Sequence, residues 1–123
     1  MKLARQPRST YRVAFRGEPI KSEPVGRVPR VSRLLALAHR IDRMVRAGEL
    51  GDLADAARRL GLSRARVSQI TNLLLLSPEI QVEILDLPNI TQGRDPISER
   101  QLRHVVAEAN WNRQLARWRE IHG

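Results

Sequence analysis

The 123-residue chain contains no cysteine and few aromatic residues: two Trp, one Tyr and one Phe. The lack of cysteine excludes disulfide frameworks, thiolate zinc sites and cysteine nucleophiles. No run of about 18 apolar residues occurs, so the sequence predicts no membrane span. With so few aromatic side chains, the core must consist of Leu, Ile, Val and Ala, which favours helices.

Lysine is also scarce, because all of the 22 basic residues except Lys2 and Lys21 are arginines. Arginine suits bidentate contact with phosphate and with guanine edges, although a GC-rich genome also favours arginine over lysine. The charge is uneven: residues 1–33 hold nine cations and two acids, whereas the rest holds thirteen cations and eleven acids. A basic arm on a near-neutral body is typical of nucleic-acid binders.

Residues 1–30 are interrupted by Pro7, Pro19, Pro24 and Pro29 and read as an extended basic arm. Within it, residues 10–16 alternate apolar and basic side chains and predict a short strand, whose partner could be a second copy, the body or a ligand. The arm lacks the apolar segment of a secretory signal, so we expect a cytoplasmic, nucleoid-associated protein. Five arm cations are candidate DNA contacts, in a minor groove or through general attraction: Lys2, Arg5, Arg8, Arg12 and Arg16.

The remaining residues, 31–123, predict a helical domain. Apolar residues recur with a helical period over 34–45, with Ser32 as the expected N-cap and Gly48 as the end. Further helices are expected at 53–60, 64–76, 78–86, 98–109 and 111–118, with caps at Asp52, Ser63, Ser77 and Ser98. We therefore expect an all-α fold, a small bundle of five or six helices.

Residues 53–76 have the pattern of a helix-turn-helix. Ala57 is small where two helices would cross, and Gly61 allows a turn with positive φ. The core-facing residues are expected to be Leu53, Ala56, Leu60, Leu62, Val67, Ile70 and Leu74. An ordinary helical hairpin is the alternative, but the polar, carboxylate-free face left on the second helix favours the DNA-binding motif.

That face predicts the DNA contacts. The expected base-reading residues are Arg64, Ala65, Ser68, Gln69 and Asn72, with Arg64 suited to guanine and Gln69 to adenine. The expected phosphate contacts are Ser63, Arg66, Arg40, Arg43, Arg30 and Arg33. Two apolar features need partners: the stripe Trp111, Leu115 and Trp118, expected to be core over the first helix or a dimer contact, and the four leucines 73–76.

Residues 53–85 contain a characteristic series of residues, and a further pair precedes the next helix. The series is Leu53-Ala54, Leu60-Gly61, Ser63-Arg64, Val67-Ser68, Leu73-Leu74, Leu76 and Ile80-Gln81, and the further pair is Ile97-Ser98. This series resembles the helix-turn-helix core of ParB-type partition proteins. The resemblance implies DNA binding with the second helix in the major groove. It does not extend to that family's nucleotide-binding domain, so CTP binding, sliding and partition are not implied.

Together these features predict a sequence-specific double-stranded DNA-binding protein, a small transcriptional regulator. The alternatives are an accessory factor for recombination or for plasmid or phage maintenance, and an RNA-binding or ribosome-associated protein. His39, His104 and His122 lack metal-ligand spacing, and no catalytic constellation is evident, so no metal, cofactor or enzymatic activity is expected. The expected partner is duplex DNA, with a homodimer left open and no membrane contact.

Overall fold

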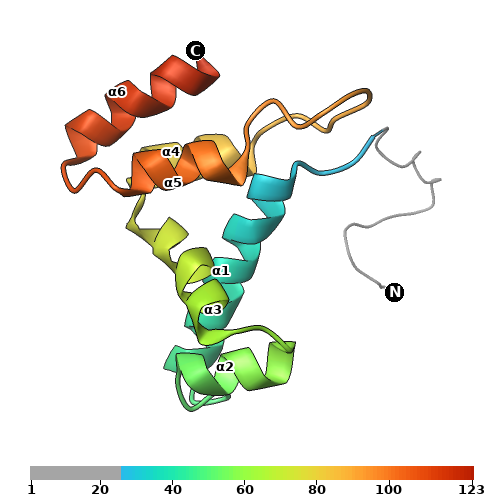
Figure 1. Ribbon diagram of the computed structural model, residues 1–123, viewed down its shortest axis with the longest axis vertical. Helices are drawn as coiled ribbons and strands as arrows, with labels where there is room; N and C mark the ends of the chain where they lie inside the picture. Colours follow the sequence, from blue (N-terminus) through green and yellow to red (C-terminus); the bar gives the residue numbers. More distant parts are fainter. Residues whose placement is uncertain (1–25) are drawn as a thin grey trace, which may run out of the picture.

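The structure, a computed structural model, describes residues 26–123 and is all-helical over that range (Figure 1). This confirms the all-α expectation, whereas residues 1–25 of the predicted arm, including the strand expected at residues 10–16, lie outside the described residues. The elements are α1 (Arg30–Arg46), α2 (Leu53–Leu60), α3 (Arg64–Thr71), the 3-10 helix η1 (Asn72–Leu75), α4 (Pro78–Leu85), α5 (Glu99–Val106) and α6 (Trp111–His122).

The helices form a stem with a layer across its upper end. In Figure 1, α1 and α3 lie side by side as the stem, α2 closes its lower end, and α4, α5 and α6 lie across the top. The lower cluster of buried residues is Ala38, Ile41, Leu50, Ala56, Ala57, Val67 and Ile70. The upper cluster is Val31, Leu35, Leu73, Leu76, Ile80, Ile84, Ile97, Leu102, Val105 and Trp118. Leu34 and Leu74 pack against both clusters and join them.

Four of the predicted helix caps are confirmed. The side chains of Asp52, Ser63 and Ser77 each accept a backbone hydrogen bond in the first turn of α2, α3 and α4, and Ser98 forms a capping box with Gln101. Gly61 ends α2 with φ at +69°, as the turn requires.

The predicted cap of the first helix was wrong. α1 begins at Arg30, and Ser32 lies inside it, buried, with its hydroxyl donating to the Ile84 carbonyl at 2.7 Å. The first-turn amide of Arg30 is instead satisfied by Asp95 Oδ2, 2.8 Å away, from the loop between α4 and α5. A side chain distant in sequence thus replaces the local cap, which a local pattern does not reveal.

Two helices end earlier than predicted, because α3 stops at Thr71 and α5 at Val106. The 3-10 turn η1 follows α3, and its period of three residues places Leu73 and Leu76 on one side. Both are buried, while Leu75 is exposed. The tighter turn therefore directs Leu73 and Leu76 into the core and leaves Leu75 at the surface. An α-helix would not place all four consecutive leucines on one face.

Three leucines expected in the core are partly exposed instead: Leu53, Leu60 and Leu62. Ala56 and Ala57 form the buried surface of α2, so the backbones approach closely and the larger leucines lie at the rim. In the predicted stripe of α6, Trp118 is fully buried and Leu115 partly buried, but Trp111 is 57% exposed. Trp118 packs in the upper cluster and donates from Nε1 to Glu83 of α4 at 2.8 Å.

Candidate nucleic-acid interface

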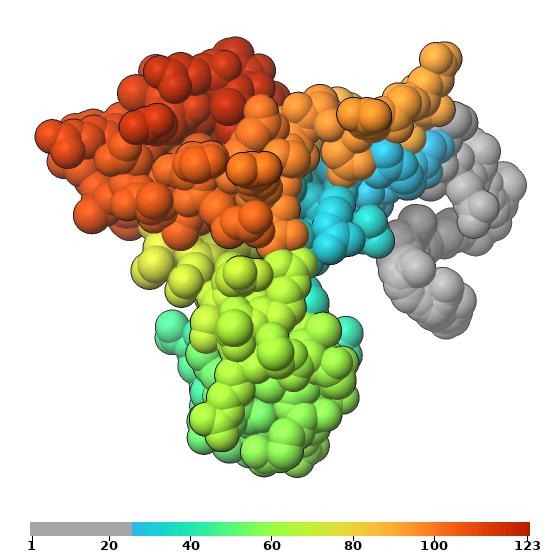
Figure 2. Space-filling model, viewed as in Figure 1, coloured from blue at the N-terminus to red at the C-terminus, as the bar shows by residue number. Residues whose placement is uncertain are grey.

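The outer face of α3 is uncovered. All five residues expected to read bases are exposed: Arg64, Ala65, Ser68, Gln69 and Asn72. Val67 and Ile70, on the opposite side of the helix, are buried in the lower cluster. Figure 2 shows the surface of α2 and α3 extending below the layer formed by α5 and α6, with no other described segment over it in this view. A ligand therefore has open access to this face.

The face carries no carboxylate, and its start is organised by Ser63. The Ser63 hydroxyl accepts from the Arg66 amide at 3.0 Å, which fixes the first turn of α3. The first turn of α3 contains no acidic residue, so the positive end of the helix dipole is not neutralised locally. This end of the helix is suited to an anion such as a phosphate group.

Arg66 is directed along the protein surface rather than outward. Its guanidinium forms a two-pronged ion pair with Glu99 at the start of α5, in which Nη2 lies 3.0 Å from Oε1. The same guanidinium donates from Nη1 to Gln69 Oε1 at 3.1 Å. The hydrogen bond to Glu99 raises the pKa of Arg66. Arg66 was expected to contact phosphate, but the structure engages it within the protein.

Glu99 contacts three arginines, each from a different helix. Besides Arg66 of α3, its carboxylate lies 3.2 Å from Nη1 of Arg103 in α5 and 3.9 Å from Nε of Arg30 in α1. The hydrogen bond from Arg66, with the charges of all three arginines, lowers the pKa of Glu99 below its usual range. Three cations share one anion, so this cluster keeps a net positive charge beside α3.

Arg30, one of the predicted phosphate contacts, therefore lies near the α3 face through its contact with Glu99, and Arg103 is a further cation that sequence reasoning missed. The only sequence signal for Arg103 was its spacing of four residues from Glu99, which is typical of a helical ion pair and does not indicate proximity to α3. The contact of Arg66 with Glu99, 33 residues apart in sequence, shows that the start of α5 lies next to α3.

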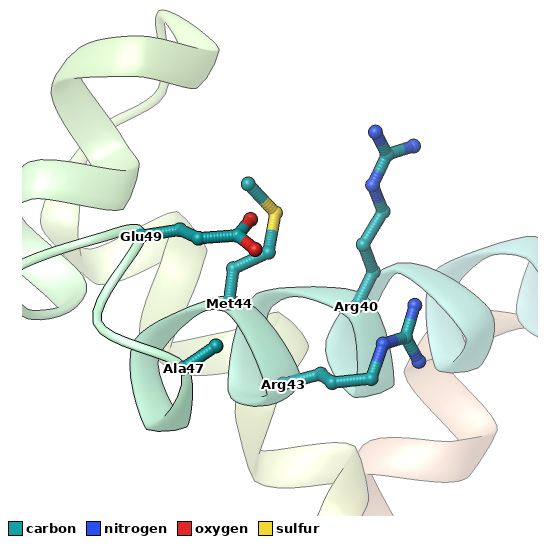
Figure 3. A pocket seen from close by; sticks show the side chains of 5 residues that line it. All are labelled: Arg40, Arg43, Met44, Ala47 and Glu49. Atoms are coloured by element: carbon teal, nitrogen blue, oxygen red, sulfur yellow. The ribbon is translucent and has the colours of Figure 1, made fainter.

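Arg40 and Arg43 lie elsewhere. α1 buries Ala38 and Ile41 in the cluster it shares with α3, and at about 100° per residue Arg43 lies on the reverse side of α1. Figure 3 shows Arg40 and Arg43 projecting from α1 at an open surface hollow beside Met44 and Glu49. By the same helical spacing, Arg40 lies at the side of α1 rather than on its reverse. Arg33 is also exposed on α1.

The structure therefore brings together some of the predicted phosphate contacts and separates others. Ser63 and Arg30 border the α3 face, Arg66 is engaged with Glu99, Arg43 faces away, and Arg40 lies at the side of α1. The arm residues Lys2, Arg5, Arg8, Arg12 and Arg16 lie outside the described range.

Within residues 26–123, none of the helices is long and apolar enough to cross a membrane. Over the same residues, His, Asp and Glu side chains form no group of three or more that could hold a metal ion. Comparison with protein-family models, with curated proteins and with solved structures finds no match.

The arrangement has the features of a binding surface. A helix end open to anions, an outward row of side chains with hydrogen-bond donors and acceptors, and adjoining arginines are the parts needed to contact a polyanion and to read polar groups on it. Ser68, Gln69 and Asn72 supply uncharged groups, and Arg64 supplies a cation whose side chain no described carboxylate engages.

Proposed function

We propose that the protein binds double-stranded DNA in a sequence-specific manner, with α2 and α3 acting as a helix-turn-helix and α3 entering the major groove. The observation that carries the proposal is the exposed face of α3, which is polar, free of carboxylates and bordered by cations. A helix is the element that the major groove of B-form DNA accommodates, and each base pair there presents its own pattern of donors and acceptors.

The charges around α3 also favour a nucleic acid over a protein partner. The chain has a net charge of +9, and Arg30 and Arg103 adjoin the α3 face. Phosphate contacts of this kind position a protein on DNA, whereas base contacts supply the specificity. The likeness of residues 53–85 to the DNA-binding core of ParB-type proteins supports the same proposal. A role in regulating transcription is the simplest function for such a chain, and an accessory role in recombination or in plasmid or phage maintenance uses the same interface.

The test is selection of bound duplexes from a randomised pool, followed by affinity measurements on the selected site. We expect Arg64→Ala to weaken binding to that site by about 1–3 kcal/mol and to relax the preference at one base pair. The matched control is Arg43→Ala, which removes the same charge from the reverse side of α1. The control should leave the base preference unchanged, because Arg43 is distant from the proposed groove.

Two outcomes would overturn the proposal. One is equal affinity for the selected duplex, random duplexes and structured RNA, which would indicate a general polycation. The other is an equal loss of affinity on every sequence after Arg64→Ala, which would make Arg64 a phosphate contact and remove the evidence for base reading by α3.

A further inference from the structure

Gln69 is the one residue of the α3 face whose polar atoms are already oriented by the protein. Its Oε1 accepts from Arg66 Nη1 at 3.1 Å. A guanidinium has donors only, so the atom that faces it must be the amide oxygen and not the amide nitrogen. The orientation of this amide therefore follows from the chemistry of Arg66, not from a choice between two similar atoms.

Arg66 is itself held in place. Its ion pair with Glu99 is bidentate, which fixes the plane of the guanidinium as well as its position. The side chains of Arg66 and Glu99 are 25% and 15% exposed, so water competes less with this pair than with a fully exposed one. The Glu99 carboxylate also forms an ion pair with Arg103 of the same helix, at 3.2 Å, and this contact further restrains its position.

From these contacts we propose that Glu99 and Arg66 make Gln69 a hydrogen-bond donor toward DNA, so that it selects a base whose exocyclic group in the major groove is an acceptor, as in guanine and thymine, rather than a donor, as in adenine. This inference rests on the proposed function of α3. With Oε1 held against Arg66, the NH2 group is the end of Gln69 that is free to project. In the major groove, guanine presents two acceptors, N7 and O6, and thymine presents O4.

This orientation of Gln69 changes the base preference expected from the residue type alone. A free glutamine contacts adenine by donating to N7 and accepting from N6–H2 at the same time. That contact needs Oε1 and Nε2 to face the base edge together, whereas here Oε1 faces Arg66. Adenine would then lose the hydrogen bond from its N6–H2 group to Oε1, which is the contact that distinguishes it from guanine and thymine. Arg66 and Glu99 act as positioning residues, and Gln69 is the residue that determines specificity.

The test uses the full chain and selection from a randomised duplex pool for the wild type and four variants. Gln69→Ala first identifies the base pair whose preference depends on Gln69. At that position we expect the wild type to favour guanine or thymine over adenine by at least about fivefold. Arg66→Met frees Oε1 and should shift the preference toward adenine. Arg117→Met, which breaks a separate arginine–glutamate pair with Glu108, is the matched control and should not change it.

Gln69→Lys keeps the test valid if Arg66→Met fails to fold, because Gln69 is exposed and its replacement does not disturb the core. Lysine is a donor only, so the preference for guanine or thymine should persist in this variant. A wild-type preference for adenine at this position would overturn the inference while leaving the function of α3 intact. A folded Arg66→Met variant with unchanged base preference would also overturn it. Failure of the wild type to select any sequence would overturn the inference and the proposed function together.

Discussion

The two ends of the molecule are built from different side chains. The upper cluster is made of large residues and includes Trp118, Leu35 and Ile84, all fully buried. The lower cluster, which supports α3, contains three alanines, and its neighbouring leucines in α2 lie at the surface. Because apolar burial is the main stabilising contribution, the upper end holds the fold together. The lower end uses small residues to bring two short helices close and leaves one face of α3 free.

The largest expected effect is at the upper end, where Trp118→Ala should lower the free energy of unfolding by about 3–5 kcal/mol. The substitution removes a fully buried indole and leaves Glu83 of α4 without its hydrogen bond from Nε1. The measurement is denaturant unfolding followed by circular dichroism. Trp111→Ala, in the same helix at an exposed position, should change stability by about 0.5 kcal/mol or less. Equal losses in the two variants would refute the burial assigned to α6.

The lower end should instead be sensitive to added volume. Ala57 is 3% exposed where α2 packs in the lower cluster, so Ala57→Leu should destabilise the protein by about 1–3 kcal/mol through overpacking. The same substitution at exposed Ala36 of α1 is the control and should be nearly neutral. A neutral Ala57→Leu would mean that the two helices do not approach as closely as the structure indicates.

The sequence predicts those features of the fold that are caused by residues close together in the chain. The caps Asp52, Ser63 and Ser77 and the turn at Gly61 were predicted correctly, because each depends on residues within one turn. The first-turn contact of Arg30 with Asp95 was not predicted, because its partner is 65 residues away. The leucines of α2 were misplaced because a helical period shows that a face is apolar but not which members a neighbouring helix covers.

The same distinction applies to the candidate interface. Ser68 and Gln69 were expected on an open face, and both are exposed. The sequence gives no sign that Arg66 is engaged by Glu99, since the two lie on helices separated by α4 and a loop. Nor does it show that Arg43 faces away from α3, because a charge pattern on α1 does not reveal on which side α3 packs.

A smaller effect is expected where the two ends meet at Glu99. Its pKa is lowered in the folded state, chiefly by the hydrogen bond from Arg66, so the unfolded chain binds a proton more readily. The stabilisation from Glu99 is therefore fully present above the usual glutamate pKa and is lost as the pH falls through the lowered value. Glu99→Gln should cost about 1–2 kcal/mol near neutral pH, and the difference from the wild type should shrink in acid.

Unfolding measured at neutral and at acid pH checks this expectation. The control is Glu108→Gln, whose partner Arg117 is 53% exposed, so that pair should contribute less than about 1 kcal/mol. A Glu99→Gln loss that stays constant from neutral to acid pH would contradict the role of the carboxylate charge in joining α3 to α5.

The smallest expected change in stability is again at the lower end of the molecule. Leu60 is 44% exposed, although the helical pattern placed it in the core. Leu60→Ala should therefore cost only about 0.5–1 kcal/mol, whereas Leu102→Ala, at a fully buried position of the upper cluster, should cost about 2–5 kcal/mol. Thermal unfolding of the two variants compares them directly. If both losses fall in the larger range, α2 is packed at its leucines, and the lower cluster is not the alanine-rich contact that leaves them at the rim.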